Sequence, residues 1–140
     1  MKQFVILSAA LLIMVSSISC NAQGTKKEVV QNGISSNVSV YYFHFTRRCA
    51  TCMAVEENAK KAVEALYPEK VKSGEYSFTA LNLDEASTKG IADKLGVGGQ
   101  TLLVVRGDKK IDITSAAWLS AHDPDKMKVE IKSGIEKVLF

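Results

Sequence analysis

The sequence predicts an α/β domain in which a mixed four-stranded sheet carries helices on both faces. Three observations predict this class. A β-branched and aromatic segment runs into an amphipathic helical pattern, and a second strand and helix follow. A buried apolar run then passes through a two-residue turn signal into another strand, and a well-capped helical pattern closes the chain. The predicted order is therefore β-α-β-α-β-β-α over residues 38–140.

The composition is that of a folded domain, with 46% hydrophobic and 24% charged residues. A chain of 140 residues is short enough for one domain and long enough to bury a core. The net charge is only +3, and the cations are scattered among acids. The charge therefore gives no reason to expect a nucleic acid or an anionic membrane surface as partner.

Residues 1–19 have the layout of a secretory signal peptide. Lys2 supplies a positive start, an uncharged apolar run extends from Phe4 to Val15, and small residues follow. The run is too short to span a bilayer. We therefore expect the domain to be exported, with a periplasmic location.

Cys20 is the expected lipidation site. The stretch "SISC" resembles the lipobox of bacterial lipoproteins, in which the cysteine becomes the lipidated first residue of the mature chain, although Ser17 stands where leucine is usual. The alternative is ordinary cleavage before Gln23, and both alternatives give an exported domain. Residues 20–37 are polar and without a period, so they predict a linker suited to holding a domain off a membrane. Membrane attachment is expected only through this lipid.

The domain is predicted to begin with a buried strand at 38–45, "VSVYYFHF". A helix is predicted to start close to Cys49 and to end at or before Tyr67, because Pro68 disfavours helical backbone in the residue before it. Its apolar stripe recurs every three or four residues, at Cys52, Val55, Ala59, Ala62, Val63 and Leu66. Two i,i+4 ion pairs are expected on its outer face, Glu56–Lys60 and Glu57–Lys61.

A second strand is predicted at 75–84 and a shorter helix at 85–96. Gly96 is the expected stop of that helix, because glycine readily adopts the left-handed conformation of a C-terminal cap. The connection from the first strand to the second contains a helix, so these strands are expected to be parallel.

A third, fully buried strand is predicted at 101–105. Gly107-Asp108 is a two-residue hairpin signal, and it leads into a strand at 109–114. The last helix is predicted from Asp123, which can cap its first turn, and Pro124 suits the first helical position.

Cys49 and Cys52 form a CxxC pair at the start of the first predicted helix. A sulfur in the first helical turn faces unpaired backbone N–H groups and the positive end of the dipole, and both favour the thiolate. Arg47 and Arg48 can add positive charge. Such settings lower a cysteine pKa from about 8.5 to roughly 3.5–7.5. Cys52 lies on the buried stripe and is expected to stay a thiol, so the pair predicts one attacking and one resolving sulfur.

The alternative function is a metal-binding module, in which Cys49 and Cys52 hold a soft ion such as Cu(I). No second CxxC and no H-x-H cluster completes a zinc site, so zinc would need a second subunit. A disulfide across two residues closes a very small loop and adds little through loop entropy, so it favours a chemical role over a structural one. Nothing in the sequence indicates flavin or nicotinamide binding, and no cofactor is expected.

These segments resemble the thioredoxin superfamily. The stretch "YYFHFTRRCATC" looks like its strand-to-CxxC segment, and "LNLDEASTKGIADKLGV" and "TLLVVRGDKKID" are similar to its next strand and helix and to its hairpin. The resemblance implies a thioredoxin-like fold over 38–140 and a thiol–disulfide oxidoreductase, with Cys49 as nucleophile and Cys52 as resolving thiol. The implied partner is an exported protein with reducible or oxidisable cysteines. A looser resemblance is to small exported thioredoxin-like proteins described as nitrophenyl-compound nitroreductase subunits.

Three residues depart from the family pattern. Arg48 replaces the usual tryptophan, Phe43 stands near the place of the usual buried acid, and Gln100 replaces the usual cis-proline. A cis bond before a residue other than proline costs about 2.5–4 kcal/mol, so the Gly99–Gln100 bond is expected to be trans. Gln100 keeps its backbone N–H and adds an amide. It is therefore expected to be able to hydrogen-bond a thiolate or a substrate chain.

Lipidation can be tested by fractionation. The wild-type protein, expressed in its host, is expected to fractionate with membranes, and Cys20→Ala is expected to release it, because the substitution removes the only predicted acyl acceptor. A soluble wild-type protein with Gln23 at its N-terminus would instead show ordinary cleavage.

Overall fold

The computed structural model describes residues 36–140, which belong to the second of two compact units, Asn32–Phe140. The predicted signal peptide at 1–19, the lipidation site at Cys20 and nearly all of the predicted linker lie outside the described residues. Among residues 36–140, no helix has the length and apolar character needed to cross a membrane.

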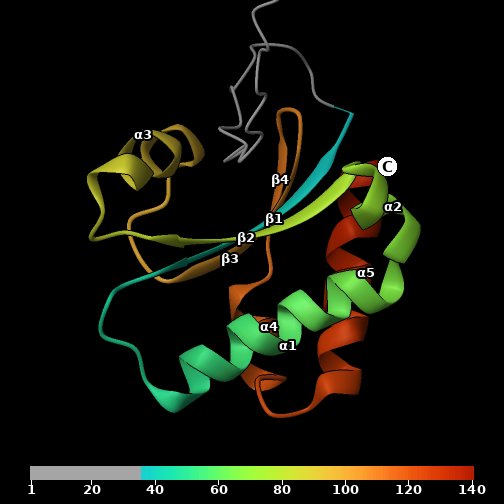
Figure 1. Ribbon diagram of the computed structural model, residues 1–140, viewed down its shortest axis with the longest axis horizontal. Helices are drawn as coiled ribbons and strands as arrows, with labels where there is room; N and C mark the ends of the chain where they lie inside the picture. Colours follow the sequence, from blue (N-terminus) through green and yellow to red (C-terminus); the bar gives the residue numbers. More distant parts are fainter. Residues whose placement is uncertain (1–35) are drawn as a thin grey trace, which may run out of the picture. The chain divides into compact units, whose positions relative to one another are not determined.

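Four strands form one mixed sheet in the order β2-β1-β3-β4 (Figure 1). Strand β1 (Val38–His44) is parallel to β2 (Tyr76–Asn82) and antiparallel to β3 (Thr101–Arg106). Strand β4 (Lys109–Asp112) completes the sheet through a hairpin with β3. The predicted mixed sheet and its parallel first pair are confirmed.

Helices cover both faces of this sheet (Figure 1). Helices α1 and α5 pack on one face and against each other, whereas α3 lies over the opposite face. The described helices are α1 (Ala50–Leu66), α2 (Pro68–Ser73), α3 (Ala86–Leu95), α4 (Thr114–Leu119) and α5 (Pro124–Leu139). The order β-α-β-α-β-β-α and the thioredoxin-like fold are therefore confirmed, with α2 and α4 as short additions that the sequence did not predict.

The core lies between the sheet and the pair α1 and α5. Alternate residues of β1 point into it, because successive side chains of a strand face opposite sides. Val38, Val40 and Tyr42 are each at most 1% exposed. They meet buried side chains of the neighbouring strand β3 and of the two long helices, including Leu102, Val104, Val55, Val63, Ile131 and Ile135. Burial of each such aliphatic side chain contributes about 1.5–3 kcal/mol.

The helix ends follow the predicted caps. The carboxylate of Asp123 accepts a 3.0 Å hydrogen bond from the backbone N–H of Lys126, and Pro124 occupies the first turn of α5. Gly96 ends α3 in the left-handed region, with φ of 71°. Pro68 both ends α1 and begins α2, since a proline suits a first helical turn but cannot continue a helix.

Helix α5 lies close against β3 at Gly134. A Cβ atom there would lie 3.0 Å from Val104 Cγ2 and 3.2 Å from Ile113 Cγ2. Both neighbours are β-branched and stiff, so they cannot easily move aside. The missing side chain of Gly134 therefore sets how closely α5 packs.

We predict that Gly134→Ala lowers the free energy of unfolding by about 1–3 kcal/mol, the usual cost of overpacking a core. Gly90→Ala in α3 is the matched control, because a Cβ at Gly90 would meet nothing within 4 Å. It should raise the free energy of unfolding by about 0.4–1 kcal/mol. Denaturant unfolding measures both, and shifts of equal sign would contradict the close approach at Gly134.

Candidate active site

Cys49 lies between β1 and α1 and is the N-cap of α1. Its backbone is extended, with φ of −83° and ψ of 167°, and its sulfur accepts a 3.3 Å hydrogen bond from the backbone N–H of Cys52. Its carbonyl accepts the N–H of Met53 at 3.2 Å, which starts the helix. The side chain is exposed. An exposed thiol thus also caps the N-terminus of a helix, because its sulfur accepts a hydrogen bond from a first-turn N–H group.

The pKa of the Cys49 thiol is lowered from its ordinary value. The largest cause is the hydrogen bond with the Cys52 side chain, and the next is the N–H of Cys52. The expected contribution of the arginines is not among the causes. Arg48 instead forms an ion pair with Glu56. Hydrogen bonds of the first turn, rather than neighbouring cations, favour the thiolate.

The Arg48–Glu56 pair also corrects one predicted surface pair. Glu56 was expected to bind Lys60, one turn along α1, but its carboxylate turns back to Arg48. The second expected pair is confirmed, because Lys61 Nζ lies 2.6 Å from Glu57 Oε1. Arg48 therefore joins the loop before Cys49 to the second turn of the helix.

Cys52 is the buried member of the pair. It is 4% exposed, and its sulfur lies 2.6 Å from that of Cys49. Its thiol is placed to donate to Gln100 Oε1, 3.6 Å away. Its backbone carbonyl accepts a 2.9 Å hydrogen bond from the Tyr42 hydroxyl. The predicted asymmetry, with one exposed and one buried sulfur, is present.

Tyr42 is a site residue that the sequence analysis missed. Burial, followed by the nearby Cys52, raises the pKa of its hydroxyl to about 12, so this group is a hydrogen-bond donor at neutral pH. Its ring lies 6.0 Å from that of Trp118 and 5.7 Å from that of His44. The sequence feature that could have identified Tyr42 is its place on the inward face of β1, because a buried tyrosine hydroxyl usually needs a polar partner.

Gln100 lies in the segment that leads into β3. Its amide faces the Cys52 sulfur, as the sequence allowed. No peptide bond within residues 36–140 is cis, so the Gly99–Gln100 bond is trans as expected. Phe43, which stands near the usual place of the acid, is fully buried on the other face of β1 from Tyr42. The β1 side chain that hydrogen-bonds Cys52 is thus the phenol of Tyr42.

The end of β2 and the loop after it hold Thr46, which lies in the loop leading to Cys49. Asp84 Oδ2 accepts a 2.8 Å hydrogen bond from the N–H of Thr46, and the amide of Asn82 donates to Thr46 Oγ1 at 2.9 Å. The bond from Thr46 lowers the pKa of the Asp84 carboxyl. A depressed folded-state pKa means that the stabilisation is present at neutral pH and is lost as the pH falls through that pKa. The sequence analysis assigned no role to Asp84 or to Asn82.

No group of three or more His, Cys, Asp or Glu side chains suited to a metal ion is found within residues 36–140. A metal bound at this site would therefore meet two thiolates from this part of the chain. Arg47, the remaining predicted neighbour, is exposed on the loop before Cys49.

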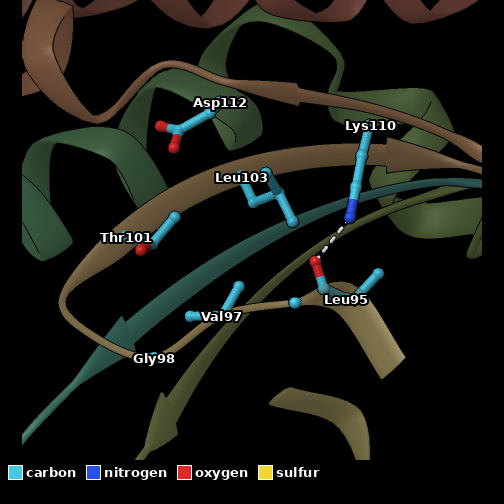
Figure 2. Close-up of a pocket in the computed structure, with 8 residues that line it drawn as sticks. Leu95, Val97, Gly98, Thr101, Leu103, Lys110 and Asp112 are labelled. Atoms are coloured by element: carbon cyan, nitrogen blue, oxygen red, sulfur yellow. Dashed lines mark hydrogen bonds between the residues drawn. The ribbon is translucent and has the colours of Figure 1, made fainter. Parts of the chain in front are cut away.

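A cavity of about 310 Å³ lies elsewhere, between the end of α3 and the β3–β4 hairpin (Figure 2). Its lining includes Gly98 and Thr101, on either side of Gln100, but neither cysteine. Lys110 Nζ crosses it and donates to the carbonyl of Leu95 at 2.7 Å (Figure 2). The carboxylate of Asp112 is already engaged by Thr114. Lys110 thus connects β4 to α3, and Asp112 connects β4 to α4.

Comparison with known proteins gives two similar solved structures. One is the crystal structure of thioredoxin O2 from Arabidopsis thaliana in the oxidised state, with a TM-score of 0.49 and 23% identity over 74% of this chain and 76% of that chain. The other is described as the structure of a malarial protein, with a TM-score of 0.45 and 16% identity over 71% and 98% of the two chains. No family model and no curated protein matches.

The asymmetry of the pair predicts unequal alkylation. Cys49 should react with iodoacetamide on the order of tenfold faster than Cys52 at mildly acidic pH, because its pKa is lowered and its sulfur is exposed. Mass spectrometry of peptides, after brief labelling of the reduced protein, measures the two rates. The Cys49→Ser variant should lose the fast phase alone, whereas equal rates at both sulfurs would favour a structural pair.

Proposed function

We propose that the domain is a thiol–disulfide oxidoreductase that acts on cysteines of exported proteins. The observation that carries this proposal is the exposed, helix-capping Cys49 sulfur with the buried Cys52 sulfur 2.6 Å behind it. One sulfur can meet a substrate, and the other can reach only the first. That division of labour suits disulfide exchange.

In the reducing direction, the Cys49 thiolate attacks one sulfur of a substrate disulfide. A Cys49–substrate disulfide forms, the substrate S–S bond breaks, and the leaving thiolate takes a proton from solvent. The Cys52 thiolate then attacks Cys49 Sγ and releases the second substrate thiolate. The substrate gains two electrons and the pair becomes a disulfide. The reverse sequence oxidises a substrate dithiol.

Apolar side chains beside the nucleophile support a polypeptide substrate. Phe45 is 38% exposed and Met53 is 52% exposed, and they precede and follow Cys49 by four residues. Exposed large apolar side chains beside a reactive group offer contact area to a partner chain. An exported partner is proposed because the sequence begins with the layout of a secretory signal, and a lipid at Cys20 would bring the domain to a membrane.

The roles of the two sulfurs can be tested by trapping. Cys52→Ser should accumulate mixed disulfides with partner proteins in the host, because nothing then resolves the first intermediate. Cys49→Ser is the matched control and should trap none. Non-reducing electrophoresis and mass spectrometry of the captured chains provide the measurement.

Two results would count against this assignment. One is the absence of trapped species from both variants. The other is one equivalent of a soft metal that survives anaerobic purification together with two protected thiols, which would favour the metal-binding alternative.

A further inference from the structure

The sulfur pair has fewer protons than acceptors once Cys49 is ionised. The Cys52 thiol then carries one proton, and two acceptors face it: the Cys49 sulfur at 2.6 Å and Gln100 Oε1 at 3.6 Å. A thiol can donate only one hydrogen bond. With its oxygen turned toward Cys52, Gln100 competes with the Cys49 thiolate for that proton.

The side-chain amide of Gln100 can also donate a hydrogen bond. Its oxygen accepts, its nitrogen donates, and the torsion that exchanges them has two broad wells about a half-turn apart. Gln100 is half-buried beside an open segment, since a Cβ at Gly98 or Gly99 would meet nothing within 4 Å. When the nitrogen faces Cys52, it can donate to a thiolate there. Within residues 36–140, the side chains that hydrogen-bond the Cys52 sulfur are those of Cys49 and Gln100.

We propose that Gln100 is the hydrogen-bonding partner of the resolving sulfur: its amide oxygen holds Cys52 as a thiol, and its amide nitrogen stabilises Cys52 as a thiolate when that sulfur attacks. This inference rests on the proposed exchange reaction and assigns its second step.

The second step shows why such a partner is needed. Once Cys49 is joined to a substrate sulfur, it is no longer an anionic acceptor for the Cys52 proton. The proton leaves to solvent, the Cys52 thiolate attacks Cys49 Sγ, the Cys49–substrate bond breaks, and the substrate thiolate departs. The developing charge on Cys52 is only 4% exposed, so solvent reaches it poorly. A donor from Gln100 replaces that lost solvation.

The other groups around Cys52 cannot take this role. The Tyr42 hydroxyl from β1 donates its one proton to the Cys52 carbonyl, so it does not donate to the sulfur. In the loop before α1, the guanidinium of Arg48 is paired with the carboxylate of Glu56. Gln100, from the segment before β3, is the group that meets the sulfur itself.

The test uses the full chain with Cys20→Ala, so that the pair alone reports, and 5,5′-dithiobis(2-nitrobenzoate) as the probe. Attack by Cys49 releases one thionitrobenzoate, and attack by Cys52 on the resulting mixed disulfide releases the second. Stopped-flow absorbance separates the phases, and a pH titration of thiolate absorbance follows ionisation of the pair.

Gln100→Met, similar in size but without the amide, should slow the second phase on the order of tenfold and leave the first unchanged, because a hydrogen bond to an ionised group is lost. Gln100→Glu accepts but cannot donate, and it carries a charge. It should slow the second phase further and move the thiolate titration to higher pH. Asn58→Asp is the matched control, since this α1 amide donates to the Ala121 carbonyl at 2.9 Å and not to a sulfur. It should leave both phases unchanged.

The outcomes separate the inference from the function on which it rests. A Cys20→Ala chain with Gln100 unchanged that releases only the first thionitrobenzoate would overturn the proposed exchange. If that Cys20→Ala chain releases both, and Gln100→Met and Gln100→Glu in the same background release them at equal rates, the role of Gln100 alone would be overturned. Equal slowing of both phases would show a merely structural role, and an unshifted titration in a folded Gln100→Glu chain would also overturn the inference.

Discussion

The hydrogen bond from the Tyr42 hydroxyl to the Cys52 carbonyl joins the central strand to the first turn of α1. The carbonyl already belongs to the helix, so the bond fixes the helix start against the sheet. Both sulfurs belong to this fixed segment, one as its cap and one on its buried face. Because the phenol is buried in the main core, the geometry of the pair depends on the packing of β1 as much as on the CxxC sequence itself.

Around this bond, three connections hold the cysteine pair and the loop that leads to it. Asp84 and Asn82 hold Thr46 on the approach to Cys49. Arg48 bridges to Glu56 on the helix. Gln100, from the segment before β3, meets the buried sulfur. They come from different parts of the chain and converge at the end of β1 where α1 begins, so the site is a property of the assembled sheet.

The sequence predicted the strands, the helices α1, α3 and α5 and the placement of the two cysteines at a helix start, because hydrophobic period and capping residues are local signals. It did not predict the contacts of Tyr42 or Asp84, because a hydrogen bond across the sheet depends on register. Arg48 was expected to aid the thiolate, but a carboxylate one turn into the helix engages it instead. Short helices such as α4 were missed because their six residues carry almost no periodic signal.

The pairing of β1 with β3 sets Tyr42 opposite Leu102 and Phe43 opposite Thr101, directly after Gln100. Side chains alternate between the faces of a sheet, so insertion of a single residue into β1 would turn the phenol toward α3 and move Gln100 out of register with Cys52. An insertion or deletion within β1 or β3 would therefore disrupt the site. The turn at Gly107 lies at the far end of β3, and there the chain can lengthen without altering the sulfur pair.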